Sequence, residues 1–138
     1  MGFAATIYRN GHSVRMKSAI LILEDDPFIA EDMAWGLERK LGIAPVIAAS
    51  NRDALKRIAK GVDFAFLDVM VLDGQSIPVA DALKSLNLPF AFVTAGERSA
   101  LPDHLKHEIL IRKPASTETL VAAIEAAQTG AADTKQQN

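Results

Sequence analysis

Five short apolar segments recur along the chain, and a stretch with the apolar spacing of an amphipathic helix follows each one. Turn-forming or charged residues bound each apolar segment, which is typical of a buried strand. Strands that alternate with helices form a parallel sheet, because parallel neighbours need long crossover connections. The predicted strands are 19–23, 44–48, 63–68, 89–93 and 109–112.

The helical segments carry start signals. Asp26 can cap the first helix, and either Ser50 or Asn51 can cap the second, since short polar side chains accept hydrogen bonds from first-turn amides. Ser116 can cap the last helix. The fourth segment, 96–105, has a weak apolar pattern and a proline in its path, so its helix should be short.

This pattern favours a single α/β domain over residues 19–128. We expect a five-stranded parallel sheet in the order 2-1-3-4-5, with helices on both faces, as in flavodoxin-like proteins. The 138 residues suffice for one domain with a substantial core and are too few for two. Residues 1–18 fit neither a strand nor a helix pattern and are expected to be disordered or extended, and 129–138 to form a flexible tail. Met16 is a candidate start of translation.

Composition excludes several classes of function. The net charge of −2 gives no electrostatic footprint for nucleic acid, so we expect no DNA partner. No apolar run approaches the roughly 20 residues that cross a membrane, and we identify no signal peptide. The absence of cysteine rules out disulfides and thiolate metal sites and is compatible with a reducing cytoplasm. We therefore expect a cytoplasmic protein without membrane contact.

Polar and charged side chains stand where four of the predicted strands end. These residues are Glu24 and Asp25 after the first strand, Asp68 after the third, Thr94 after the fourth and Lys113 after the fifth. In the order 2-1-3-4-5 the first and third strands are neighbours, so three carboxylates should meet at one edge of the sheet. Carboxylates this close cannot all stay ionised without a partner, and a hard cation such as Mg²⁺ would resolve the repulsion.

The other two side chains suit phosphoryl chemistry. Thr94 and Lys113 would lie on one side of Asp68, where a hydroxyl and an ammonium can hold phosphoryl oxygens. A bound cation would neutralise an approaching phosphoryl group, and Asp68 could then act as a nucleophile and form an aspartyl phosphate. Each residue alone has an ordinary explanation as a helix cap, strand residue or surface lysine. The set together favours the functional interpretation.

Four motifs carry these residues in order: LILEDDP, FLDVMVLDG, FVTAG and IRKPAS. Over nearly all of residues 19–128 the chain resembles the receiver domain of two-component response regulators. The order and spacing of the motifs are more specific than any one of them. The stretch PVADALKSLNLPFAFVTAG is similar to a subgroup of small stand-alone receivers.

The resemblance implies a role for each acidic residue. Asp68 corresponds to the phosphoryl acceptor, and Asp25 to the direct Mg²⁺ ligand, with Glu24 acting through water. The backbone carbonyl of Met70 would be the third protein ligand. A shift of one position, which makes the pair Asp25 and Asp26, is the alternative.

The resemblance also covers the other side of the site, with two departures. Thr94 corresponds to the switch hydroxyl, and Lys113 to the family's lysine, whose bond to Pro114 would be cis. The aromatic residue that the family often has three positions before the lysine is replaced by Leu110, which puts the usual switch in doubt. The proline that commonly follows the acceptor by four positions is replaced by Leu72.

The function implied is that of a single-domain response regulator. It would accept a phosphoryl group on Asp68 from the phosphohistidine of a sensor histidine kinase or phosphotransfer protein, with Mg²⁺ as cofactor. It would signal to a downstream protein partner, through the face of helix four, strand five and helix five, or act as a phosphate sink. Such a domain is not an enzyme beyond weak self-dephosphorylation.

Two alternatives stay open. One is a receiver-like adaptor that is never phosphorylated. The other is an aspartyl-phosphate phosphatase of the haloacid-dehalogenase type, which needs a second aspartate where Met70 stands. A homodimer is also open: Phe28 and Trp35, seven residues apart, form either an exposed stripe or, as we prefer, half-buried packing. The nearby His104 and His107 make a poor metal site and are expected to be solvated.

Overall fold

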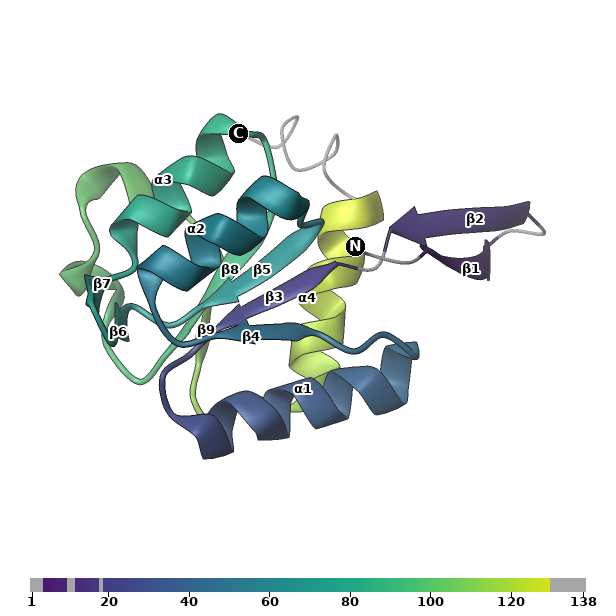
Figure 1. Ribbon diagram of the computed structural model, residues 1–138, viewed down its shortest axis with the longest axis horizontal. Coiled ribbons are helices and arrows are strands. Elements are labelled where there is room, and N and C mark those ends of the chain that lie inside the picture. The colour runs from purple at the N-terminus through teal and green to yellow at the C-terminus, as the bar shows by residue number, and fades with distance from the viewer. Residues whose placement is uncertain (1–3, 10–11, 18, 130–138) are drawn as a thin grey trace.

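The computed structural model describes residues 4–9, 12–17 and 19–129. Within them, a parallel sheet of five strands has the order β4-β3-β5-β8-β9 (Figure 1). In chain order this is 2-1-3-4-5, so the predicted fold class is confirmed. The strands are β3 (Ile20–Leu23), β4 (Val46–Ala48), β5 (Phe64–Leu67), β8 (Phe90–Thr94) and β9 (Leu110–Arg112).

Four α-helices of the described chain cover the two faces of this sheet (Figure 1). One face packs on α2 (Asn51–Lys60) and α3 (Ile77–Ser85), and the other packs on α1 (Pro27–Leu41) and α4 (Thr117–Thr129). Successive side chains of a strand point to opposite faces. In β3, for example, Leu21 belongs to the core under α2 and α3, whereas Ile22 belongs to the core under α1 and α4. The carboxyl ends of all five strands therefore meet at one edge between two apolar layers.

The predicted caps begin the helices. The Asp26 carboxylate accepts hydrogen bonds from two first-turn amides of α1, at 2.9 and 3.3 Å. The Ser50 hydroxyl accepts from the Asp53 amide at 3.1 Å, so Ser50 caps α2 and not its neighbour. The Ser116 hydroxyl accepts from the Thr119 amide at 3.1 Å at the start of α4. These caps place the first turns of α1 and α4 directly after functional strand ends.

The prediction of a short fourth helix in 96–105 is wrong. Residues 95–108 contain no α-helix and instead form two short 3₁₀ turns, η1 (Arg98–Ala100) and η2 (Asp103–Leu105). Pro102 lies between them, and proline cannot donate the backbone hydrogen bond that a continuous helix needs there. Leu101 and Leu105 are buried and anchor the segment to the core. The face expected to signal therefore has turns where a helix was expected.

Helices α1 and α4 approach each other closely at Gly36. A β-carbon added at Gly36 would lie 2.2 Å from the Thr117 hydroxyl oxygen, closer than any van der Waals contact. Glycine is therefore needed at this position for the two helices to pack as they do. The contact fixes the start of α4 against the middle of α1.

The N-terminal segment contains two strands that the sequence pattern did not predict. Strands β1 (Ala4–Arg9) and β2 (His12–Lys17) pair antiparallel, with Arg9 opposite His12, although the sequence fitted no strand pattern. The Asn10-Gly11 dipeptide is a strong signal for a two-residue hairpin connection and outweighs the imperfect alternation. Of the proposed tail, 129–138, Thr129 is the last residue of α4 and 130–138 lie outside the described residues. The proposed start at Met16 stays a prediction.

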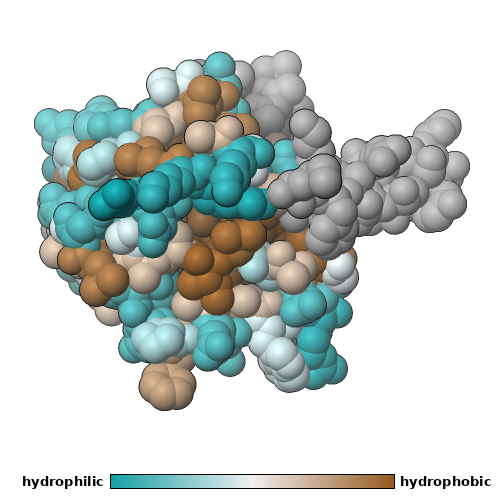
Figure 2. Space-filling view, in the orientation of Figure 1, coloured by the Kyte–Doolittle hydropathy of each residue, from teal (hydrophilic) through white to brown (hydrophobic). Residues whose placement is uncertain are grey.

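Strand β4 is one of the two edge strands of the sheet. Figure 2 shows apolar surface between α1 and α2, over this strand. Ile47 on β4 and Leu55 on α2 are both partly exposed there. None of the helices in the described ranges is long and apolar enough to cross a membrane.

A small hairpin that the sequence pattern did not predict follows β5. Its strands are β6 (Met70–Val71) and β7 (Gly74–Gln75). The carboxylate of Asp73, in the turn, accepts hydrogen bonds from the amides of Asn51 at 2.7 Å and Arg52 at 3.1 Å. These bonds lower the pKa of Asp73 and fasten the hairpin to the first turn of α2.

We expect Asp73→Asn to lower the melting temperature at pH 7, because a neutral amide is a weaker acceptor for helix amides than a carboxylate. The folded-state pKa of Asp73 lies below its ordinary value of 3.8. Its contribution is therefore complete above pH 3.8 and is lost as the pH falls through the folded-state value.

Thermal unfolding followed by circular dichroism from pH 7 downwards checks this expectation. The difference between wild type and variant should be constant at neutral pH and shrink below pH 3.8. Asp103→Asn is the matched control, since Asp103 is exposed and pairs with Lys106 on the surface. A difference that does not change with pH would contradict the assignment.

Candidate functional site

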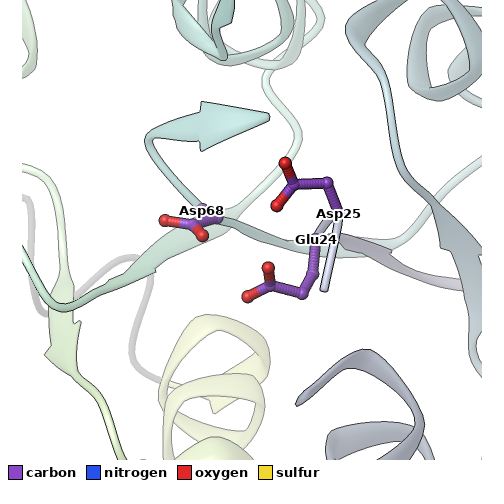
Figure 3. A group of neighbouring side chains, drawn as sticks. All are labelled: Glu24, Asp25 and Asp68. Carbon is purple, nitrogen blue, oxygen red and sulfur yellow. The ribbon is translucent and has the colours of Figure 1, made fainter. Parts of the chain in front are cut away.

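Three carboxylates gather where β3 and β5 end side by side (Figure 3). Glu24 and Asp25 follow β3, and Asp68 follows β5, where its amide donates to the Leu23 carbonyl at 2.9 Å. One oxygen of each carboxylate lies within 4.8 Å of the others. The structure therefore brings together the three acids that the sequence pattern placed at one edge.

The cluster has the chemistry of a hard-cation site. Glu24 is buried, Asp68 is partly buried and Asp25 is exposed, so the cluster opens to solvent on one side. Mg²⁺ binds oxygen atoms at about 2.1 Å, which separates opposite ligands by roughly 4.2 Å, and it retains several waters. An oxygen separation of up to 4.8 Å fits this geometry after a small movement or with one water between. The residues present therefore suit Mg²⁺.

Asp26 does not belong to this cluster. Its carboxylate is engaged with the first turn of α1, at 2.9 Å from the Phe28 amide. The group of neighbouring carboxylates comprises Glu24 and Asp25 with Asp68. The geometry thus favours the pair Glu24 and Asp25 over the alternative pair shifted by one residue.

Lys113 reaches the acids from the end of β9. Its ammonium donates to Asp68 Oδ2 at 2.8 Å and also to Glu24 Oε1. Burial lowers the pKa of Lys113, but the hydrogen bonds to Asp68 and Glu24 outweigh it and raise the pKa. Burial raises the pKa of Glu24, although hydrogen bonds from Lys113 and the Asp26 amide act against it. Lys113 is thus a positive counter-charge held between two carboxylates.

The Asp68 carboxylate is oriented from both sides. Its Oδ1 accepts from the Val69 amide at 2.7 Å, and its Oδ2 accepts from Lys113. Thr94, the last residue of β8, is buried, and its hydroxyl accepts from the Gly96 amide at 3.1 Å. The Lys113 amide donates to the Thr94 carbonyl at 3.1 Å, so the ends of β8 and β9 are joined beside the acids.

Other residues singled out from the sequence lie around this centre. Met70 begins β6, two positions after Asp68, and is 57% exposed. Leu110 is half-buried against the core under α2 and α3. Lys113-Pro114 is a cis peptide bond, as the resemblance implied.

One expectation about the surface was wrong. Phe28 is 82% and Trp35 60% exposed, so the preferred interpretation of half-buried packing fails for both. Positions seven apart lie on the same side of a helix, and here that side of α1 is exposed to solvent. His104 and His107 are both exposed, as expected, and the Nε2 of His104 lies 2.7 Å from a carboxylate oxygen of Asp81. Neither histidine belongs to a group of three or more candidate metal ligands among the residues described.

Comparison with known proteins identifies relatives at 30–34% sequence identity. The phyllosphere-induced regulator PhyR of Methylorubrum extorquens is 33% identical over 118 residues, which cover 81% of this chain. The match covers 44% of PhyR, so the chain spans less than half the length of that relative. The solution structure of SdrG from Sphingomonas melonis Fr1 is 34% identical, with a TM-score of 0.68 over 79% of this chain and 94% of SdrG.

The receiver domain of the PhyR response regulator from Erythrobacter litoralis is 30% identical, with a TM-score of 0.66 over 80% of this chain and 89% of that domain. The chain belongs to the response regulator receiver family. No family model matches the chain. Receivers act in phosphoacceptor signalling and are generally not enzymes, and they bind Mg²⁺ at an acidic pocket. In this receiver, the Glu24, Asp25 and Asp68 cluster has the composition of such a pocket.

One contact beside this receiver site was not predicted. Arg112, the residue before Lys113, donates to a Glu97 carboxylate oxygen at 2.7 Å. The sequence held a signal for this pair, since opposite charges stand at the ends of strands that should be neighbours. Whether Arg112 and Glu97 come within contact distance depends on the conformation of the loop after β8, which the sequence pattern did not predict.

Proposed function

We propose that this chain is a single-domain response regulator whose Asp68 accepts a phosphoryl group from the phosphohistidine of a sensor histidine kinase or phosphotransfer protein. The observation that carries the proposal is the position of Asp68 between Lys113 and the carboxylates of Glu24 and Asp25. An oxygen of the Asp68 carboxylate attacks phosphorus. The phosphorus–nitrogen bond of the donor breaks, and its electron pair returns to the imidazole.

The surrounding residues orient this transfer and stabilise charge. Glu24 and Asp25 would hold Mg²⁺, together with Asp68 and the Met70 carbonyl, and the cation would neutralise the incoming phosphoryl group. The Val69 amide and Lys113 orient the acceptor carboxylate. The Lys113 ammonium can then exchange its contact with a carboxylate for a contact with a phosphoryl oxygen.

Thr94 supplies the response to phosphorylation. Its hydroxyl, which accepts from the Gly96 amide, would turn to bond a phosphoryl oxygen. Support comes from a relative: SdrG, 33% identical, has been solved in a BeF3-activated conformation. The output would be contact with a downstream protein through the surface of η1, η2, β9 and α4, or removal of phosphoryl groups as a sink. We propose a cytoplasmic location and no DNA or membrane partner, and the homodimer stays an open alternative.

Incubation with acetyl phosphate and Mg²⁺, followed by intact-mass measurement, tests the proposal. We expect the mass of one phosphoryl group to be added in the presence of Mg²⁺. No mass should be added when EDTA chelates the cation during the incubation. Transfer from candidate kinases, scored in the same way, would then identify the donor. No added mass from acetyl phosphate or from any kinase would favour the non-phosphorylated adaptor.

We expect the phosphorylated protein to lose its phosphoryl group slowly. The positions two residues after Asp68 and two after Thr94 are Met70 and Gly96, and neither side chain can orient an attacking water. The decay of phosphorylated protein, followed by mass after the donor is removed, measures this rate. Loss within seconds without a phosphatase would contradict the expectation.

A matched pair of variants sharpens the decay measurement. Met70→Gln places a hydrogen-bonding group beside the acceptor and should accelerate decay severalfold. Leu72→Gln puts the same side chain at another exposed position of the same loop and should leave the rate unchanged. Equal decay rates for the two variants would show that the side chain at position 70 does not control the loss of the phosphoryl group.

A further inference from the structure

Arg112 closes the loop that follows Thr94. The two residues lie opposite each other in the pairing of β8 with β9. The guanidinium of Arg112 donates to Glu97 at 2.7 Å and approaches the Gly96 carbonyl at 3.4 Å. The Arg112 side chain thus contacts both Gly96 and Glu97, which lie in the loop directly after β8.

The same loop holds the Thr94 hydroxyl. The Gly96 amide donates to Thr94 Oγ1 at 3.1 Å, while the carbonyl of Gly96 faces Arg112. Gly96 therefore connects the Arg112–Glu97 pair to the hydroxyl on which the response to phosphorylation depends. If Thr94 turns away, the Gly96 amide loses its acceptor, and the loop must change its position or bind water.

No aromatic side chain performs this coupling at β9. Leu110 occupies the position, three residues before Lys113, where the family often has an aromatic residue, and it is half-buried against the apolar core. An aliphatic side chain cannot hydrogen-bond to Thr94 or to the loop. The described polar contacts between β9 and the loop after β8 are those of Arg112 and the backbone of Lys113.

Movement of Glu97 would pass directly into the turns that follow it. Arg98 begins η1 and donates to the carbonyls of Lys106 at 2.6 Å and Glu108 at 2.7 Å. Lys84 of α3 pairs with Glu108 at 3.0 Å. One continuous set of polar contacts therefore runs from the end of β8 through η1 to α3.

We propose that Arg112 and Glu97 are positioning residues for Thr94: their ion pair holds the loop that keeps the Thr94 hydroxyl on Gly96 in the unphosphorylated protein. Release of the pair accompanies the movement of Thr94 toward a phosphoryl group on Asp68. This inference rests on the proposed function. Both partners are largely exposed, so the pair biases the equilibrium by a small factor and phosphorylation can overcome it.

Rates of phosphorylation by acetyl phosphate and Mg²⁺ test the inference. Arg112→Gln and Glu97→Gln should each increase the rate about two- to fivefold, the range that an exposed ion pair supports. The charge-swapped double variant, Glu97→Arg with Arg112→Glu, should return toward the wild-type rate. Asp103→Asn, which breaks the surface pair with Lys106 in the same segment, is the control and should change nothing.

A second measurement does not depend on phosphorylation. Amide hydrogen exchange of Gly96 in the unphosphorylated protein should be faster in Arg112→Gln and Glu97→Gln than in wild type or Asp103→Asn. A general loss of structure would instead accelerate exchange throughout β8. Restoration by the charge-swapped pair separates positioning from a merely structural role.

The outcomes distinguish this inference from the proposed function. If wild type gains no phosphoryl group on Asp68, the proposed function fails, and Gly96 exchange still tests the positioning. If wild type is phosphorylated but both single variants behave like Asp103→Asn in rate and exchange, the inference is overturned and the proposed function stands. Faster phosphorylation that the charge swap does not reduce would also overturn it.

Discussion

Asp68→Asn is expected to gain no phosphoryl group from acetyl phosphate, with a rate at least about a hundredfold below that of wild type, because removal of a nucleophile eliminates the covalent step. The amide has nearly the shape of the carboxylate and can still accept from the Val69 amide. The fold should therefore be retained. Intact mass after incubation with Mg²⁺ measures the effect, and peptide mapping of wild type identifies the modified residue.

The control for this variant lies a few residues away. Asp73→Asn makes the same chemical change in the hairpin that follows Asp68, outside the carboxylate cluster. It should still gain a phosphoryl group, even though its stability is lower. Equal labelling of wild type and Asp68→Asn would show that another side chain is the acceptor.

Lys113→Met is expected to impair both phosphorylation and folding. Removal of the ammonium leaves Glu24, 3% exposed, facing Asp68 without a counter-charge. Loss of a charged donor at a reacting phosphoryl group should slow phosphorylation about a hundredfold. The free energy of unfolding should fall by about 2–3 kcal/mol, less than for a fully enclosed pair because the cluster opens to water.

Added Mg²⁺ gives this variant a distinctive signature. A cation that binds the unpaired carboxylates replaces the missing positive charge, so Mg²⁺ should raise the melting temperature of Lys113→Met more than that of wild type. Lys84→Met is the matched control, since Lys84 is an exposed lysine paired with Glu108. An identical response to Mg²⁺ in wild type and Lys113→Met would contradict the assignment of the cation site.

Much of the candidate site could be predicted because its residues stand at strand ends. A run such as that of β5 is buried on both sides, so the position of Asp68 after it fixes which sheet edge the carboxylate occupies. The caps Asp26 and Ser116 were equally predictable, since a cap depends only on residues within one turn. What the sequence pattern conveyed was where the elements begin and end.

The parts that could not be predicted depend on contacts between distant residues. The turns η1 and η2 have no apolar period, and Arg98 holds their shape through carbonyls 8 and 10 residues away. The β6–β7 hairpin has strands too short to show alternation, and Asp73 attaches it to α2 from 22 residues away. The exposure of Trp35 could not be deduced either, because a helix pattern shows which side is apolar but not how far the partner layer extends.

The close approach of Gly36 to Thr117 has a mechanical consequence. The Thr117 side chain occupies the space that a β-carbon would need at Gly36, so the two helices resist sliding past each other, because a shift would force atoms to overlap. The layer of α1 and α4 should therefore behave as a stiff plate behind the sheet. The turns on either side of Pro102 contain no α-helix and are anchored to the core by two buried leucines, Leu101 and Leu105, so they are the more compliant part. Phosphorylation of Asp68 should accordingly move the turns η1 and η2 and leave the packing of α1 on α4 unchanged.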